Sequence, residues 1–188
     1  MSRVTSIEEL SNLKSKIETE RKFTKQVLIC GGTGCISSGS NEIADKMTEK
    51  VKAAGKENEI RVIKTGCFGF CEKGPIVKML PDNTFYTEVT PEDADRLVET
   101  HLLKEEKIEE LLYVDPVTKN KISDSDHMDF YKKQERVALR NCGVIDPENI
   151  EDYLLYDGYT ALDKVLKMSQ QEVVDIMKDS GLRGRGGG

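Results

Sequence analysis

The first half of the chain alternates between helical and strand-like patterns of hydrophobic residues. Apolar side chains recur at helical spacing over 6–20 and again over 41–54, where Gly55 ends the pattern. Two short runs, QVLIC at 26–30 and EIRVIK at 59–64, are typical of strands. A strand, a helix and a strand in this order predict a βαβ unit with a right-handed crossover, so the two strands are expected to be parallel.

A hairpin and a further helix follow this unit. The runs PIVKML at 75–80 and TFYTEV at 84–89 flank the turn signal Pro-Asp-Asn and are predicted as antiparallel strands. Thr90 and Pro91 then mark the start of a helix that ends near residue 103. The order α-β-α-β-β-β-α predicts an α/β fold with a four-stranded mixed sheet flanked by helices, which is the thioredoxin-like arrangement.

The second half of the chain has a different pattern. Charged blocks alternate with turn signals over 106–143, and we predict an extended linker there that lies along a partner surface. Three short helical stretches follow, at 147–156, 158–168 and 169–180. The pattern therefore divides the chain into a domain at 1–105, the linker, and a short helical segment at 144–188.

Composition and charge narrow the class of protein. The chain has 188 residues and a net charge of −6, which argues against general binding to nucleic acid or to anionic membranes. Its partners are therefore expected to be proteins. The N-terminus lacks the apolar stretch of a signal peptide, and no apolar run approaches the length of a membrane span. We predict a cytoplasmic location.

Four of the five cysteines lie in two short glycine-rich motifs. CGGTGC places Cys30 and Cys35 where the first predicted strand ends and a glycine-rich loop begins, and CFGFC places Cys67 and Cys71 in the loop after the second. Loops that follow parallel neighbouring strands emerge at one edge of a sheet, so the four sulfur atoms can converge there. Neighbouring glycines let backbone N–H groups point at sulfur, which stabilises an anionic cluster. Four thiolates on two loops suit a [2Fe–2S] centre.

Other roles for these cysteines stay open. A structural zinc ion is also bound by four cysteines, and C-x4-C with C-x3-C falls within the spacing that zinc sites tolerate. A pair of disulfides or a dithiol switch fits less well, because neither motif has the C-x-x-C spacing of thioredoxin-type catalysis and cytosolic thiols are kept reduced. Structural cysteines would be expected among apolar neighbours rather than glycines.

The remaining side chains show less specific patterns. Cys142 stands alone and is predicted to be a packed or free thiol. Phe68 and Phe70, within CFGFC, either shield the centre from water or fill the core beneath the loop. No group of residues forms a catalytic pattern, so no residue is predicted to be catalytic.

The cysteine spacing resembles that of a known family. C-x4-C followed by C-x3-C, with Gly-Pro shortly afterwards, is similar to the thioredoxin-like [2Fe–2S] ferredoxins. The resemblance implies that Cys30, Cys35, Cys67 and Cys71 bind a [2Fe–2S] cluster and that 1–105 is an electron-transfer module. The alternative function is a zinc-stabilised docking domain, which would position a flavoprotein without carrying electrons.

The C-terminal part resembles a second group of proteins. NCGVIDPENIEDYLLYDGYTAL at 141–162 and SGLRGRGGG at 180–188 are similar to the start of the flavin-binding, NADH-oxidising subunit of respiratory complex I. A ferredoxin domain, a linker and this segment in one chain resemble the beta subunit of soluble NAD(P)-linked or electron-bifurcating [FeFe] hydrogenases and related formate dehydrogenases. The resemblance implies that 144–188 is a truncated, helical start of an FMN- and NADH-binding domain, cut inside the flavin-phosphate loop.

The same resemblance assigns a role to the terminal glycines. Gly184, Arg185, Gly186 and Gly187 match positions that approach FMN in the intact flavoproteins, where backbone donors and a guanidinium hold the flavin. Most of a flavin must be buried by a pocket, so FMN and NAD(P) are expected only in the full-length parent. The implied partners are the iron–sulfur and catalytic subunits of a hydrogenase or a formate dehydrogenase.

Overall fold

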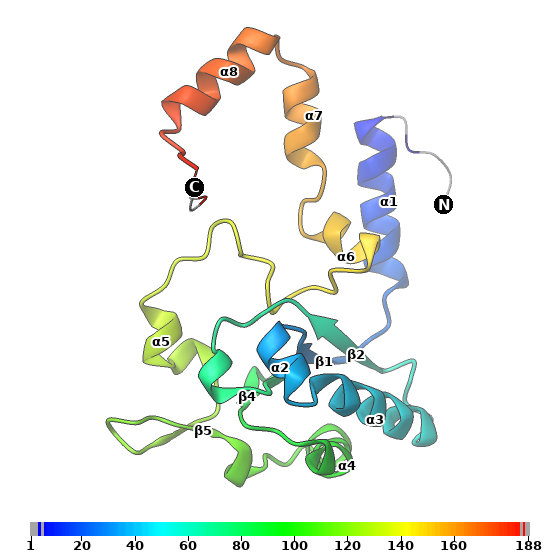
Figure 1. Ribbon diagram of the computed structural model, residues 1–188. Helices are drawn as coiled ribbons and strands as arrows, with labels where there is room; N and C mark the ends of the chain where they lie inside the picture. Colours follow the sequence, from blue (N-terminus) through cyan, green and yellow to red (C-terminus); the bar gives the residue numbers. More distant parts are fainter. Residues whose placement is uncertain (1–3, 5, 185, 187–188) are drawn as a thin grey trace.

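A four-stranded mixed sheet forms the centre of the structure, with the strand order β2-β1-β3-β4 (Figure 1). The computed structural model describes residues 4, 6–184 and 186 of the chain. The strands are β1 Lys25–Cys30, β2 Ile60–Thr65, β3 Val77–Leu80 and β4 Thr84–Tyr86. β1 pairs with β2 in parallel and with β3 in antiparallel orientation, and β3 and β4 form a hairpin. The predicted mixed sheet is confirmed.

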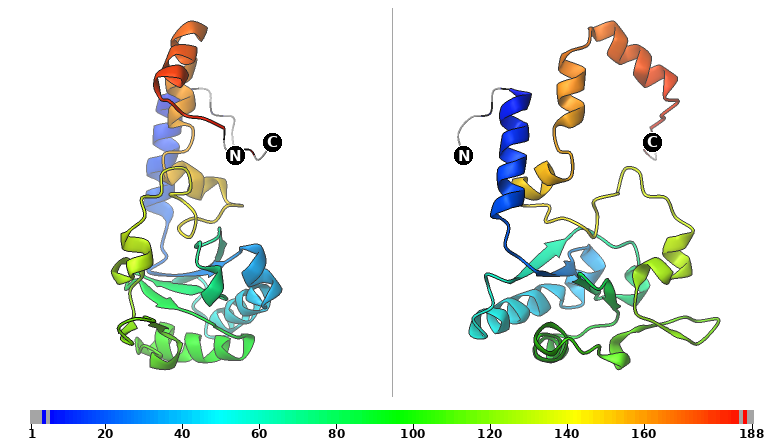
Figure 2. Two further views of the ribbon diagram at one scale, coloured as in Figure 1. Left: turned by 60° about the vertical axis from the view of Figure 1, so that its left-hand side comes forward. Right: turned by 180° about the vertical axis from the view of Figure 1, so that it is seen from behind.

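Both faces of the sheet are covered, which explains the continuous apolar run of β1. Successive side chains of a strand point to opposite faces. Val27 and Ile29 accordingly belong to one buried cluster, whereas Leu28 and Cys30 belong to another. Figure 2 shows α3 on one side of the sheet and the segment around α5 on the other. Cys30 therefore faces the side opposite α3.

The predicted helices begin close to the expected positions, whereas the short helices α2 and α5 were not predicted. The bounds of the helices are α1 Ile7–Glu20, α2 Thr33–Ser37, α3 Ser40–Ala53, α4 Ala94–Arg96, α5 Asp129–Lys132, α6 Ile150–Leu155, α7 Thr160–Leu166 and α8 Gln170–Asp179. Ser6 accepts the Glu9 N–H at 3.1 Å and so caps α1. Ser169 and Glu172 form a capping box at the start of α8. Serine is among the residue types that favour the capping position of a helix.

The helix predicted to start at Thr90 changes type along its length. Thr90 forms a capping box before a 3-10 turn at Pro91–Asp93, and α4 then continues as a π-helix over Leu97–Leu102. The π-helix places His101 in the core, where its Nδ1 lies 2.6 Å from the Tyr86 hydroxyl. Burial lowers the pKa of His101, so the neutral ring is the stable form.

Part of the predicted linker packs against the sheet. Its short strands β5 Tyr113–Val114 and β6 Lys121–Ile122 pair with each other, and single bridges join its backbone to both ends of β4. The side chains of Ile108 and Met128 are buried in the two clusters that cover the sheet. These apolar residues are too widely spaced to give a periodic signal. The sequence therefore predicted an extended linker from its charged blocks and did not indicate this packing.

The helices after residue 147 rise away from the sheet. α6 lies beside α1, while α7 and α8 extend further out (Figures 1 and 2). On α8, the apolar side chains of Ile176 and Met177 are both exposed. Within the described part of the chain, no helix is both long enough and apolar enough to cross a membrane.

A buried carboxylate fastens α6 to the domain below it. Asp152 accepts hydrogen bonds from Arg61 at 2.8 Å, from Arg21 just after α1, and from the Asp146 N–H at 2.8 Å. Burial alone would raise the pKa of Asp152, but these donors outweigh burial and hold that pKa below its ordinary value. The carboxylate therefore joins α1, β2 and α6 in its ionised form.

We expect Asp152→Asn to lower the free energy of unfolding by about 3 kcal/mol at pH 7, because two arginines lose their buried counter-charge. A carboxyl group whose pKa is depressed by folding stabilises the protein above its unfolded-state pKa, and this stabilisation is lost as the pH falls through the lower, native pKa. The difference between the variant and the wild type should therefore shrink below about pH 4. Urea unfolding of both proteins at several pH values measures this difference in unfolding free energy.

Asp157→Asn is the matched control for this experiment. Asp157 pairs with Lys14 at 3.0 Å, but its side chain is 67% exposed. Removing an exposed pair should cost less than about 1 kcal/mol. Equal losses in the two variants would show that the buried carboxylate has no special role in holding α6.

Candidate metal centre

The four predicted cysteines lie at one edge of the sheet. Cys30 ends β1 and Cys35 lies in α2, while Cys67 follows β2 and Cys71 starts the 3-10 turn Cys71–Lys73. Since β1 and β2 run in parallel, the loops that follow them leave the sheet at the same edge (Figure 1). The parallel pairing of the two strands thus brings both cysteine motifs to the same edge of the sheet.

The sulfur atoms are arranged as two neighbouring pairs. Cys67 Sγ lies 3.8 Å from Cys71 Sγ, and the Cys35 side chain is hydrogen-bonded to Cys30. Gly32 lies between the pairs, because a Cβ atom there would be 3.1 Å from Cys67 Sγ and 3.5 Å from Cys30 Sγ. Among the described residues, no three Cys, His, Asp or Glu side chains gather around the position of a single metal ion.

The two pairs differ in their exposure to solvent. Cys30 is 1% exposed and Cys35 is 2% exposed, whereas Cys67 is half-buried and Cys71 is exposed. One side of the site is therefore embedded in the core, in the cluster that contains Phe68 and Phe85. The other side reaches the protein surface.

The surroundings of Cys35 and Cys71 make the ionisation of these two thiols less favourable. Burial, followed by the hydrogen bond and the charge of Cys30, raises the pKa of the Cys35 thiol to about 12. The hydrogen bond with Cys67 raises the pKa of Cys71 as well. A bound metal reverses this preference, because coordination deprotonates a thiol. Metal binding here should therefore release protons.

Glycines bring the backbone into close contact with the sulfur atoms. A Cβ atom at Gly74 would lie 2.6 Å from Cys35 Sγ, closer than real Cβ atoms approach another atom. Gly69 has a φ angle of +80°, and its N–H donates to Cys67 Sγ at 3.3 Å. Four thiols, a tight backbone cradle and a direct N–H donor form a donor set that fits a [2Fe–2S] cluster, which takes four cysteine ligands.

The two phenylalanines of CFGFC lie in different surroundings. Phe68 is buried beside Cys30 and packs edge-on against Phe85 with ring centroids 5.6 Å apart. Phe70 is half-buried and lies against Phe130, with ring centroids 4.8 Å apart. Phe68 thus fills the core beneath the loop, while Phe70 covers it from outside.

Three residues near the site were not predicted to belong to it. Tyr131 and Arg136 both donate to the Phe68 carbonyl, and Cys142 Sγ lies 3.2 Å from the position of a Cβ atom at Gly66. Cys142 is a free, half-buried thiol, as expected. No pattern in the sequence identifies Tyr131 or Arg136, because their bonds are made to a backbone oxygen far along the chain.

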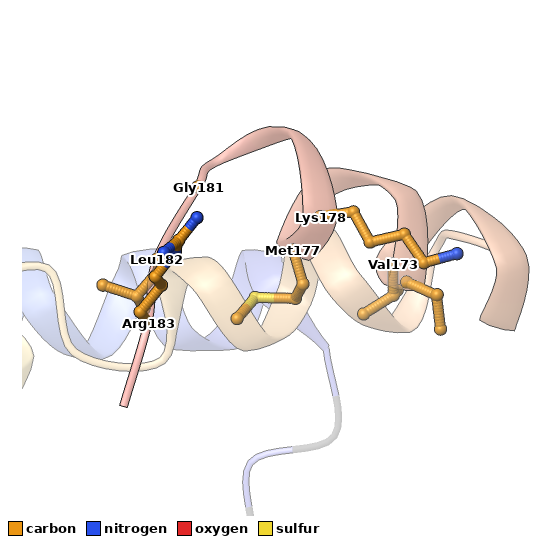
Figure 3. Close-up of a pocket in the computed structure, with 7 residues that line it drawn as sticks. Val173, Met177, Lys178, Gly181, Leu182 and Arg183 are labelled. Carbon is orange, nitrogen blue, oxygen red and sulfur yellow. The ribbon is translucent and has the colours of Figure 1, made fainter. Parts of the chain in front are cut away.

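Of the terminal glycine loop, the described residues Gly184 and Gly186 lie apart from this site. Gly184 and Gly186 are exposed, and a Cβ atom at either would have no other atom within 4 Å. Arg185 and Gly187 lie outside the described residues. Before the glycines, a shallow pocket is formed by the last turns of α8 and the chain that follows it (Figure 3). Its labelled lining residues are Val173, Met177, Lys178, Gly181, Leu182 and Arg183.

The N-terminal half of the chain is similar to known ferredoxins. The family model of the thioredoxin-like [2Fe-2S] ferredoxins matches residues 3–102. A 2Fe-2S ferredoxin of Clostridium pasteurianum is 36% identical over 77 residues, which cover 41% of this chain and 76% of that ferredoxin. The matched stretch is more than half of the chain, and the description of the family names both a thioredoxin-like fold and a [2Fe-2S] cofactor.

Two further relatives are subunits of larger enzymes. The NADP-reducing hydrogenase subunit HndC of Solidesulfovibrio fructosivorans is 64% identical over 56 residues, which are 30% of this chain and 11% of that subunit. A subunit of the NADH-quinone oxidoreductase of Mycobacterium tuberculosis is 62% identical over 32 residues, 17% of this chain and 7% of that subunit. The chain thus spans only a small part of the length of either subunit.

We expect Gly74→Ala to disturb the cysteine site, because its new methyl group would overlap Cys35 Sγ. Overpacking of this kind costs about 1–3 kcal/mol of unfolding free energy, and the displaced thiol should reduce the iron bound per chain. Urea unfolding and iron analysis after anaerobic reconstitution measure the two effects. Gly34→Ala is the matched control, since no atom lies within 4 Å of a Cβ there. Full iron content and unchanged stability in both variants would contradict this description of the cradle.

Proposed function

The chain belongs to the thioredoxin-like [2Fe-2S] ferredoxin family, and on this premise we propose that Cys30, Cys35, Cys67 and Cys71 are the ligands of its [2Fe–2S] cluster. The observation that carries the assignment is the convergence of the four sulfur atoms as two pairs on loops at one sheet edge. Family membership makes the chain an electron-transfer module. When bound, the cluster accepts one electron and releases it again.

The residues around this centre hold it in place and determine the side from which electrons can reach it. Cys30 and Cys35 fix one side of the site in the buried core, and Phe68 fills the space beneath the loop. Cys71 is exposed, so electrons should enter and leave on the side of the second pair. The Gly69 N–H holds the Cys67 sulfur in place by a hydrogen bond. No bond of a substrate is made or broken by these residues.

We extend the proposal to the organisation of the whole chain. Residues 1–105 are the ferredoxin domain, 106–143 form a linker that partly packs on it, and 144–188 begin a flavoprotein segment. The similarity to the hydrogenase subunit and to the NADH-quinone oxidoreductase subunit supports this division. The module then serves a multi-subunit oxidoreductase that uses FMN and NAD(P), in which Gly184, Arg185, Gly186 and Gly187 contribute to the flavin site.

The partners and location follow from the same comparison. The relatives are subunits of multi-subunit complexes, so the chain is proposed to pass electrons to iron–sulfur and catalytic subunits of a hydrogenase or formate dehydrogenase complex. A cytoplasmic location is supported by the proposed use of four cysteines as metal ligands, since cysteines gathered in a reducing compartment more often bind metal than form disulfides. A zinc-stabilised docking domain is the competing function, and metal analysis distinguishes the two.

The chain purified without oxygen should contain about two iron and two sulfide ions, because a binuclear centre is held by four cysteines. It should absorb visible light when oxidised and give a spin one-half EPR signal after reduction by one electron. Metal analysis, sulfide analysis and EPR of the same sample provide the measurement. One zinc ion per chain with no sulfide would refute electron transfer and favour the docking function.

Replacing Cys30, Cys35, Cys67 or Cys71 by Ser should abolish or strongly change the visible spectrum, because each change removes a thiolate ligand. Cys142→Ser is the matched control, since Cys142 packs against Gly66 without belonging to either sulfur pair. Absorption and EPR spectra of the five variants, prepared identically, test the ligand set. A normal spectrum in one of the first four, together with a lost spectrum in the control, would show that the set is wrong.

A further inference from the structure

One peptide group connects the C-terminal half of the chain to a cysteine of the cluster site. It is the amide between Phe68 and Gly69, whose N–H donates to Cys67 Sγ at 3.3 Å. Its carbonyl oxygen accepts from the Tyr131 hydroxyl at 3.0 Å and also from the Arg136 guanidinium. The donors and the sulfur therefore lie at opposite ends of a single amide.

The Arg136 guanidinium is held firmly in this position. Its Cζ lies 5.0 Å from the centre of the Tyr131 ring, and one of its nitrogens donates to the Cys142 carbonyl at 3.3 Å. Another nitrogen is 3.4 Å from the position of a Cβ atom at Gly69. No ion pair joins Arg136 to a carboxylate in the described part of the chain. Its positive charge is thus directed at the cysteine loop.

Hydrogen bonds on the two sides of an amide strengthen each other. Donors at the carbonyl oxygen withdraw electron density from the peptide group, which makes its N–H a stronger donor. A stronger N–H bond to sulfur and a nearby positive charge both favour the more negative, reduced state of an iron–sulfur centre. Two donors at the Phe68 oxygen, one of them charged, should therefore make reduction easier.

We propose that Arg136 and Tyr131 are positioning residues that raise the reduction potential of the cluster through the Phe68–Gly69 amide. The inference rests on the proposed function, because it requires Cys67 to be a cluster ligand. Both residues lie outside the stretch 3–102 that the ferredoxin family model matches. The potential of the module is accordingly set in part by the segment that follows the ferredoxin domain.

A redox titration of the 188-residue chain followed by EPR tests this role. In Arg136→Met, the ratio of reduced to oxidised cluster at a fixed potential should fall about tenfold, which is about 59 mV for one electron. Arg136→Lys keeps the charge and a donor, so most of the loss should be recovered. Tyr131→Phe removes one neutral donor and keeps the ring, so it should shift the potential in the same direction by less.

Arg140→Met is the matched control for charge. Arg140 lies on the same segment and is exposed, and no bond from it to the cysteine loop is present in the described structure. Its removal should leave the potential unchanged. Thermal unfolding of every variant shows whether the fold is kept. If Arg136→Met does not assemble a cluster, Tyr131→Phe and Arg136→Lys still test the connection separately.

The outcomes separate this inference from the function on which it rests. Wild-type protein with zinc and no sulfide would refute the proposed function and this inference with it. A normal cluster with the same potential in wild type, Arg136→Met and Tyr131→Phe would overturn this inference alone. An equal shift in Arg140→Met would also overturn it, because the effect would then come from net charge rather than from the amide.

Discussion

The parallel pairing of β1 with β2 is the constraint on which the cysteine site depends. In this register Cys30 lies opposite Thr65, so both strands end at the same level of the sheet. The next residue, Gly31, continues the contact by donating its N–H to the Thr65 carbonyl at 2.8 Å, and a Cβ atom there would lie 2.7 Å from that same oxygen. The two loops therefore leave the sheet already in contact, and a one-residue slip of either strand would separate the motifs.

Holding thiols this close together is unfavourable unless a cation is bound. Burial raises the pKa of Cys35 and the hydrogen bond with Cys67 raises the pKa of Cys71, so these two side chains resist becoming thiolates. The packing of both sheet faces provides the free energy that keeps them together, because Cys30 and Cys35 are part of one of the two hydrophobic clusters. The hydrophobic core thus helps to position the Cys30 and Cys35 side chains.

Local sequence signals predicted the strands, the capped helices and the cysteine motifs, because each of these depends on neighbouring residues. The short helix α2 was not predicted, since glycines at its start gave the pattern of a loop. The packing of 106–143 was also not predicted, because it depends on backbone bonds such as the one from Phe85 N–H to the Ser123 carbonyl. The role of Arg136 was not predicted for the same reason. Its partner is a backbone oxygen 68 residues earlier, and every residue type has a backbone carbonyl, so the sequence does not indicate the bond.

The segment after the ferredoxin domain is fastened to it at several separate places. Arg136 binds the cysteine loop, the Thr65 hydroxyl donates to the Ile145 carbonyl at 2.6 Å, and Asp152 binds Arg61 of β2. Arg61 and Thr65 lie in β2, and the cysteine loop follows directly after this strand. All three bonds are therefore made to β2 or to the loop that follows it. Because β2 also leads into the second cysteine pair, α6 and the cysteine loop are attached to the same strand. Hydrogen bonds therefore join two parts of the chain that sequence composition separates.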